Sequence, residues 1–289
     1  MVENFKHIGI IGKYAESSVS ETLRALTDYL QSRDLSLLLD DATAEVWPDH
    51  GLNIANREQL GRKCDLAIVV GGDGTFLNAA RSLAHHDIAL LGLNLGRLGF
   101  LTDISPGEMQ AKLDDIFDGK YTEEERFLLQ CRVLRDGEQI SQSDAFNDVV
   151  VHKWDVARMI EVDTYINGTF VYTLRSDGLI VSTPTGSTAY ALSGGGPILQ
   201  PCLNAMTLVP ICPHTMSNRP IVIDANTVVE IVIKGEGQVH AQISCDGQIN
   251  LGVVAGDRVQ IRKKEHPVKM IHPIDHDHFH VLREKLNWG

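Results

Sequence analysis

The sequence lacks long apolar runs, has few aromatic residues and shows no regular cysteine pattern. Nowhere do about 18 apolar residues follow one another, so no helix is expected to span a membrane. Aromatic residues make up 6% of the 289 residues and are scattered, which argues against a stacking surface for single-stranded nucleic acid. The five cysteines are never spaced as Cys-x-x-Cys, so we expect free thiols and a reducing cytoplasm.

Positive charge is also scarce. The chain has 26 Lys and Arg against 38 Asp and Glu, a formal net charge of -12, which argues against an extended nucleic-acid-binding face. A local basic pocket for a small phosphorylated ligand remains compatible with this balance. The apolar run at residues 8–11 is too short for a signal peptide. The length predicts two domains.

Hydrophobic patterning divides the chain near residue 125. Strands alternate with helical spacing before that point, which predicts an α/β domain with a mainly parallel sheet over residues 1–125. Short β-rich runs with turn signals such as Asp246-Gly247 predict a β-rich domain over residues 126–271. Residues 272–289 are predicted to form a short helix or tail. Residues 40–60 are polar and receive no assignment.

A glycine-rich stretch, Gly71-Gly72-Asp73-Gly74-Thr75, stands between a predicted buried strand and a predicted helix. Such a turn presents backbone N–H groups and the positive end of a helix dipole, which suits a phosphate. Asp73 would repel phosphate, so its presence indicates that it holds a hydroxyl, a proton or a metal. The alternative is an ordinary turn in which Asp73 or Thr75 caps the helix. The spacing matches neither a Rossmann fingerprint nor a Walker loop.

A second stretch, residues 182–197, combines hydroxyls, glycines and one tyrosine, Tyr190. Small donors beside a ring suit a nucleotide, while the alternative is a flexible surface loop. Several isolated polar residues are candidates for ligand contacts, but each is also compatible with a solvated turn residue or a surface ion pair. They are Asn147, Asp148, Arg158, Arg175 and Asp177. The histidines at 272, 276, 278 and 280 have a poor metal-ligand spacing, so we predict surface or interface histidines and no metal site.

Together these motifs resemble the bacterial NAD kinases. The resemblance is carried in order by the glycine stretch at 71–75, by residues 94–102, by Asn147-Asp148, and by residues 175–179 and 183–190. It extends from about residue 5 to about residue 285. The 71–75 motif is shared with diacylglycerol-type lipid kinases, whereas the 183–190 block is much more specific to NAD kinases.

The resemblance implies an α/β domain, a β-rich domain and an active site in the crevice between them. It implies transfer of the ATP γ-phosphate to the 2′-hydroxyl of the adenosine ribose of NAD, giving NADP, with Mg²⁺ on the ATP phosphates and Asp73 as general base. The implied nucleotide-binding residues are Gly71, Gly72, Gly74, Thr75, Phe100, Asn147, Asp148, Arg158, Arg175, Asp177, Thr188, Ala189, Tyr190, Ala191, Leu192, Ser193 and Gln248.

Two other functions stay open at this point. A diacylglycerol-type lipid kinase would share the first motif, but should lack the second and bind membranes. A non-catalytic NAD(P)-binding sensor would keep the fold, although a pure binder gains little from Asp73. For a kinase of this type we expect small-molecule substrates, no nucleic-acid or membrane partner, a cytoplasmic location, and a homodimer or homotetramer.

Overall fold

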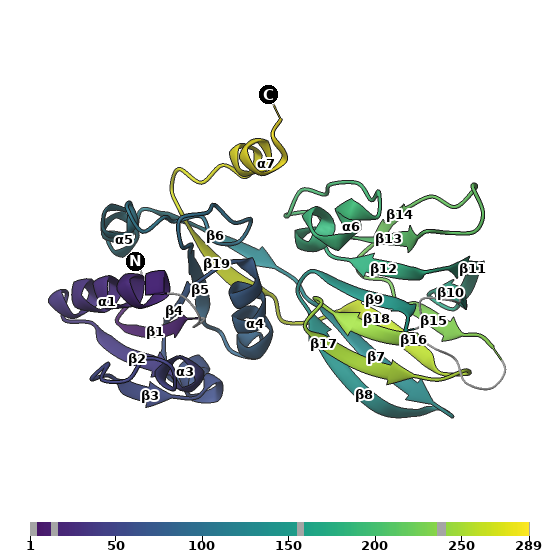
Figure 1. Ribbon diagram of the computed structural model, residues 1–289, viewed down its shortest axis with the longest axis horizontal. Coiled ribbons are helices and arrows are strands. Elements are labelled where there is room, and N and C mark those ends of the chain that lie inside the picture. Colours follow the sequence, from purple (N-terminus) through teal and green to yellow (C-terminus); the bar gives the residue numbers. More distant parts are fainter. Residues whose placement is uncertain (1–4, 13–16, 155–158, 236–240, 289) are drawn as a thin grey trace. The chain divides into compact units, whose positions relative to one another are not determined.

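The computed structural model describes residues 5–12, 17–154, 159–235 and 241–288 (Figure 1). The chain forms two compact units. The α/β unit comprises Met1–Glu125 and Val268–Gly289, and the β-rich unit comprises Arg126–Pro267. Among the described residues, no helix is long and apolar enough to cross a bilayer.

A seven-stranded sheet forms the centre of the α/β unit. Its strands, in spatial order, are β3 (Asn53–Ala55), β2 (Ser36–Asp40), β1 (His7–Gly12), β4 (Leu66–Val70), β5 (Ala89–Leu93), β19 (Val268–Pro273) and β6 (Tyr121–Arg126). In this spatial order, each strand from β3 through β19 pairs in parallel with the next. Strands β4 and β5 are buried along their whole length, as expected for a parallel sheet covered on both faces. The prediction of a mainly parallel sheet is therefore confirmed.

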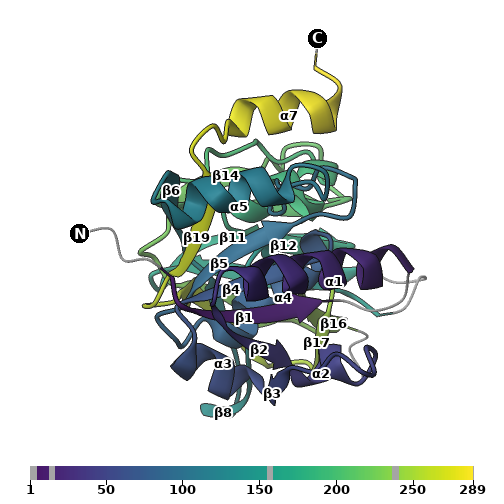
Figure 2. The ribbon, with the colours of Figure 1, turned by 90° about the vertical axis from the view of Figure 1, so that its left-hand side faces the viewer.

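Helices cover both faces of this sheet. They are α1 (Ser17–Ser32), α2 (Asp41–Ala44), α3 (Arg57–Lys63), α4 (Asp73–Leu83) and α5 (Met109–Phe117). The last helix of the unit, α7 (His278–Leu286), stands away from the sheet (Figure 1). Figure 2 looks onto the face that α1 and α5 cover. Their apolar residues, including Leu26 and Leu113, share one core with Ile8 and Ile10 of β1. On the opposite face, a Cβ added to Gly9 would lie 3.3 Å from Leu60 of α3, so this helix packs closely there.

The β-rich unit contains two antiparallel six-stranded sheets. The first has the order β11 (Thr169–Ser176), β10 (Ile160–Ile166), β15 (Val229–Ile233), β18 (Arg258–Lys263), β7 (Leu129–Arg135) and β8 (Glu138–Ala145). The second has the order β14 (Ile221–Asp224), β13 (Ala205–Ile211), β12 (Gly178–Ser182), β9 (Asp148–Lys153), β16 (Ala241–Cys245) and β17 (Ile249–Val253). Alternate residues of both sheets enter a single core, so the unit is a β-sandwich.

The outer face of the second sheet is also covered. All five residues of β12 are buried, because Ile180 packs beneath Ala191 of the short helix α6 (Tyr190–Ser193). A Cβ at Gly194 would lie 2.9 Å from Val209, so a side chain there would push the segment off the sheet. Part of the glycine-rich character of residues 182–197 therefore serves packing.

The structure differs from the sequence-based expectation at the carboxyl end of the β-rich domain. The sequence analysis places residues 268–271 in the β-rich domain, whereas β19 pairs in parallel with β5 and belongs to the sheet of the α/β unit. Strand periodicity reveals that a segment is extended, but it does not reveal which sheet takes it. The sequence analysis does not predict strand β13, which contains Pro210. Proline is tolerated there because β14 pairs only with residues 205–208 of β13.

Candidate functional site

The glycine turn lies where β4 ends and α4 begins. The N–H of Gly71 donates to the carbonyl of Leu93 at the end of β5 (2.9 Å), so the turn is joined to the end of the neighbouring strand. A Cβ at Gly71 would lie 2.7 Å from Oγ1 of Thr75, which explains the small residue. Helix α4 has Gly72 as its N-cap and no capping side chain. Asp73 is thus the first residue of the helix, and its carboxylate is used elsewhere.

That carboxylate is held by the backbone of the loop after β5. Oδ2 of Asp73 accepts from the N–H of Phe100 (3.1 Å), and Oδ1 accepts from the N–H of Leu101 (3.0 Å). A Cβ at Gly99 would collide with Oδ1 of Asp73, so only glycine fits beside it. Asp73 itself is half-buried, while Gly72 and Gly74 are exposed. The carboxylate is therefore oriented yet remains open to a ligand at the turn.

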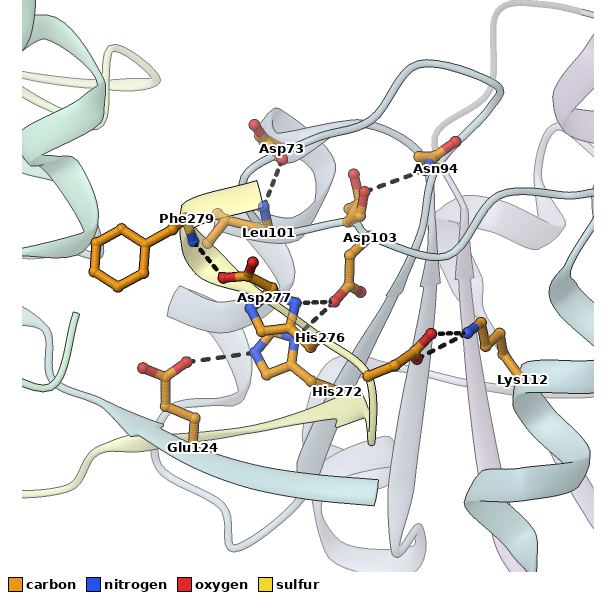
Figure 3. A network of polar contacts seen from close by, with 12 residues as sticks. Asp73, Asn94, Leu101, Asp103, Lys112, Glu124, His272, His276, Asp277 and Phe279 are labelled. Carbon is orange, nitrogen blue, oxygen red and sulfur yellow. Dashed lines mark hydrogen bonds and ion pairs between the residues drawn. The ribbon is translucent and has the colours of Figure 1, made fainter. Parts of the chain in front are cut away.

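The loop that carries these donors is internally fixed. Nδ2 of Asn94 donates to the carbonyl of Thr102 (3.2 Å), and Oδ1 of Asn94 accepts from the N–H of Gly96 (2.8 Å). Figure 3 shows how Asp73, Leu101 and Asn94 lie around this loop. Lys285 of α7 lies over the ring of Phe100, 5.6 Å from its centroid. A rigid loop of this kind keeps the Asp73 carboxylate in one orientation.

The β-rich unit contains a cavity of about 430 Å³. Five residues proposed from the sequence line it: Asn147, Asp148, Asp177, Ala189 and Tyr190. Residues that the sequence analysis had not placed in a site line it as well: Val150, His152, Lys153, Ile211, Ser244, Asp246 and Gly247. Tyr190 is 48% exposed, so its ring is accessible to a ligand. Lys153 pairs with Asp177 (2.8 Å), which leaves carboxylates as the main charged groups of the wall.

Asp246 organises one side of this cavity. Its carboxylate accepts the N–H groups of three successive residues, Phe146 (2.9 Å), Asn147 (2.7 Å) and Asp148 (3.1 Å). The sequence showed Asp246 only as part of an Asp-Gly turn, and nothing local indicates that it binds a segment 98 to 100 residues away. It is the main site residue that the sequence analysis missed.

Asp148 is 4% exposed and faces this second carboxylate. Burial, followed by repulsion from Asp246, raises the pKa of Asp148 from its ordinary value of 3.8 to about 7. The side chain therefore changes between acid and carboxylate near neutral pH. A group of this kind can donate to or accept from a ligand hydroxyl, and strongly shifted acids in a cavity often mark functional sites.

The hydroxyl-rich block of residues 182–197 is largely turned inward. Oγ1 of Thr183 donates to the carbonyl of Phe146 (2.7 Å) and accepts from the N–H of Gly186 (3.0 Å). Oγ of Ser187 accepts from the N–H of Leu199 (2.9 Å). The 3-10 turn Thr185–Thr188 is held in this way. The block is therefore an ordered scaffold that positions Ala189 and Tyr190 at the cavity, and the flexible-loop alternative is wrong.

Several predicted binding residues lie away from the cavity wall. Arg175 is exposed on β11, 3.7 Å from Glu161, and Gln248 is exposed in the turn after β16. Ala191 is buried against the sheet. The remaining members of this group, around α6, are Thr188, Leu192 and Ser193. Arg158 lies outside the described residues.

The prediction of surface or interface histidines at the carboxyl end is wrong for His272, which is buried inside the α/β unit. This side chain is buried on β19, and its Nδ1 lies 2.9 Å from Oδ2 of Asp103. Nδ1 of His276 lies 2.7 Å from the same oxygen. These contacts to both histidines outweigh burial and lower the pKa of Asp103 to about 2. The partner acid is 169 residues away in sequence, so the histidine spacing alone could not reveal it.

The α/β unit has a parallel sheet whose glycine turn holds an oriented acid at a helix N-terminus. The β-rich unit of the same chain is a β-sandwich with an acidic cavity. This organisation is that of a two-domain protein that handles phosphate. The family described as ATP-NAD kinase N-terminal domain matches residues 8–121, and the ATP-NAD kinase C-terminal domain matches residues 146–273. The chain belongs to the ATP-NAD kinase family.

Relatives and solved structures agree with this assignment. NAD kinases of Pseudomonas entomophila and Pseudomonas putida are each 51% identical over 288 residues, covering 100% of this chain and 97% of theirs. An NAD kinase from Archaeoglobus fulgidus, solved in complex with ATP, is 26% identical with a TM-score of 0.78, covering 97% of this chain and 98% of that one. A yeast NADH kinase complexed with NADH shares the fold, with 22% identity and a TM-score of 0.90, covering 99% of this chain and 89% of that one.

Proposed function

We propose that this protein transfers the γ-phosphate of ATP to the 2′-hydroxyl of the adenosine ribose of NAD, giving NADP, with Asp73 as the general base. The family assignment supports the reaction. The observation that carries the role of Asp73 is its orientation by the N–H groups of Phe100 and Leu101 at the N-terminus of α4. Each carboxylate oxygen accepts one of these hydrogen bonds and has capacity for a second, which a ribose hydroxyl can use.

Phosphoryl transfer depends mainly on positioning and on stabilising charge. The exposed backbone at Gly72 and Gly74 and the dipole of α4 suit a phosphate at this turn. Mg²⁺ fits the donor set here, because Asp73 offers hard oxygen atoms and Mg²⁺ usually keeps several waters and the substrate phosphates as ligands. When bound with ATP, it neutralises phosphate charge. Asp73 takes the proton of the attacking hydroxyl as its oxygen bonds to the γ-phosphorus, while the bond to the β-phosphate breaks and ADP leaves.

The cavity of the β-rich unit is proposed to bind the nucleoside parts of NAD. Its carboxylates, Asp148 and Asp246, disfavour phosphate and favour hydroxyl, amide and cationic groups. Tyr190 offers an exposed ring against which a base or the nicotinamide can stack. Arg175, Gln248 and the residues around α6 are proposed to contact NAD after side-chain movement, since they do not line the cavity in this structure.

The test is to incubate the purified protein with ATP, Mg²⁺ and NAD and to measure NADP with an NADP-specific dehydrogenase. We expect ATP-dependent NADP formation. NAD binding without turnover would identify a sensor, and phosphate incorporation into diacylglycerol vesicles without NADP would identify a lipid kinase; either result would overturn the proposal. The location in the cytoplasm and the homodimeric or homotetrameric state are further parts of the proposal, tested by fractionation and by light scattering.

Asp73→Asn tests the base directly. The amide cannot take a proton, and one of its ends presents N–H groups to the backbone donor of Phe100 or Leu101. We expect kcat to fall at least ~100-fold, the lower range for loss of general-base catalysis. Asp136→Asn is the control, because Asp136 is an exposed turn residue with φ 51°, a conformation that asparagine tolerates. Near-normal kcat in Asp73→Asn would show that Asp73 is not the base.

A further inference from the structure

The cluster of Asp103, His272 and His276 points to a further site. All three residues belong to the α/β unit, and their ligand atoms lie within 4.8 Å of one another. Asp103 follows the loop after β5, whereas the histidines lie at the end of β19 and in the turn beyond it. That turn is closed by the N–H of His276 donating to the carbonyl of Pro273 (2.9 Å). Three donors from two segments that are distant in the sequence therefore converge on one point, as Figure 3 shows.

The two imidazoles share one carboxylate oxygen. Both Nδ1 atoms lie within 2.9 Å of Oδ2 of Asp103, and the rings are stacked with centroids 4.1 Å apart. The second oxygen, Oδ1 of Asp103, is buried and makes no hydrogen bond to any residue in the described ranges. An unsatisfied buried carboxylate oxygen is costly. A cation beside this carboxylate satisfies it, and a histidine-rich set with one carboxylate suits a transition metal.

Glu124 of β6 adds a second feature typical of metal sites. Its Oε2 lies 3.5 Å from Nε2 of His272, on the side of the ring opposite Asp103. A neutral imidazole has one N–H, so His272 cannot donate to both acids. Without a metal, the proton on Nδ1 bonds to Asp103. When a metal takes Nδ1, that proton is released and the N–H is on Nε2, where it faces Glu124. Metal-binding histidines commonly donate their other N–H to a carboxylate in this way.

We propose that Asp103, His272 and His276 bind a divalent transition-metal ion of the Zn²⁺ type, with water as the fourth ligand and Glu124 orienting His272. Tetrahedral Zn²⁺ at about 2.0–2.2 Å from each donor places the donors about 3.3 Å apart. Each Nδ1 now lies 2.7–2.9 Å from Oδ2 of Asp103, so each of these two distances must lengthen by about half an ångström. His276 is 14% exposed, which gives the ion a path from solvent. The ion joins the carboxyl-terminal segment to the loop that follows β5.

The site is separate in chemistry from the ATP-bound Mg²⁺. Nitrogen ligands suit Zn²⁺, Co²⁺ or Ni²⁺, whereas Mg²⁺ prefers oxygen alone. Asp103 is only two residues beyond Leu101, whose N–H donates to Asp73. Metal binding is therefore expected to fix the backbone on the carboxyl side of the Asp73 contact.

The test uses the full-length protein, treated with a chelator and free of nucleotide. Calorimetry with Zn²⁺ is expected to show one equivalent bound, and Co²⁺ is expected to give the visible absorption of a four-coordinate ion with nitrogen ligands. His276→Gln removes a partly exposed ligand with little risk to folding, and should weaken Zn²⁺ binding at least ~10-fold. His280→Gln is the matched control, since His280 is an exposed histidine outside the cluster.

Absence of Zn²⁺ and Co²⁺ binding by the chelated wild-type protein would overturn the proposal. So would equal binding by His276→Gln and wild type, or equal loss in His276→Gln and His280→Gln, which would indicate unspecific chelation by exposed histidines. Thermal unfolding provides a second measurement: Zn²⁺ should raise the Tm of wild type and His280→Gln equally, and should raise that of His276→Gln less at the same Zn²⁺ concentration. Neither measurement depends on kinase activity.

Discussion

Replacing Asp148 by asparagine should change how the stability of the β-rich unit depends on pH. In the unfolded chain, the Asp148 carboxyl loses its proton near pH 3.8, whereas burial and Asp246 keep it protonated in the folded chain up to about pH 7. Between these values the unfolded state binds fewer protons than the folded state. The free energy of unfolding therefore falls as pH rises, by about 1.4 kcal/mol per pH unit for this one group.

The full effect is about 4 kcal/mol, since the pKa differs by about three units between the two states. This destabilisation is absent below pH 3.8, the pKa of Asp148 in the unfolded chain, and complete above pH 7. Asparagine has the same shape but cannot ionise, so Asp148→Asn removes this dependence. Other titrating groups cancel when the variant is compared with wild type at the same pH, because distant sites contribute independently.

The assay is a urea titration of both proteins at pH 5, 6, 7 and 8. Unfolding should be followed through NMR methyl signals of Val149, Val181 and Leu208, because these residues lie in the core of the β-rich unit and report on it alone. Relative to wild type, the free energy of unfolding of Asp148→Asn should rise by about 2 kcal/mol between pH 5 and 7 and by little more above that. A difference that stays constant across this range would refute the account of Asp148. Asp136→Asn, in an exposed turn, should show no such trend.

Two further substitutions test the candidate site. Gly99→Ala should lower kcat at least ~10-fold and destabilise the α/β unit by about 1–3 kcal/mol, because the added Cβ displaces the Asp73 carboxylate. Steady-state kinetics measures the first effect and urea unfolding the second. The control is Gly107→Ala, where an added Cβ has no neighbour within 4 Å. Unchanged kcat in Gly99→Ala would contradict the packing described for Asp73. Tyr190→Ala should raise the KM for NAD more than the KM for ATP, with the exposed Phe170→Ala as control, and an equal rise for both substrates would remove Tyr190 from the NAD site.

Local features of the fold were predictable from the sequence. The strands around Leu66–Val70 and the glycine turn follow from apolar runs and glycine placement, which are properties of a few neighbouring residues. Residues 40–60 could not be assigned because their elements are short and polar. The edge strand β3 has two exposed residues, and α3 depends on a capping box between Asn56 and Gln59.

Long-range partnerships in the candidate site were not predictable. Asp246 accepts a hydrogen bond from the backbone of Asn147, which is 99 residues away in the sequence. Asp103 contacts His272, which is 169 residues away in the sequence. Such contacts depend on which strands become neighbours in three dimensions. A single sequence carries no local pattern for that choice, so the acid at the turn could be found from the sequence while the residues that fix its surroundings could not.

The return of the chain into the first sheet has a consequence for synthesis on the ribosome. Strand β19 stands between β5 and β6 in the sheet, yet it is made only after all of the β-rich unit has emerged. The α/β unit therefore stays one interior strand short for the length of Arg126–Pro267, while the β-rich unit can already close its own core. A chain that stops before Val268 leaves the edges of β5 and β6 without their shared neighbour, and such open edges favour aggregation. Premature termination near the carboxyl end should therefore harm the amino-terminal sheet most.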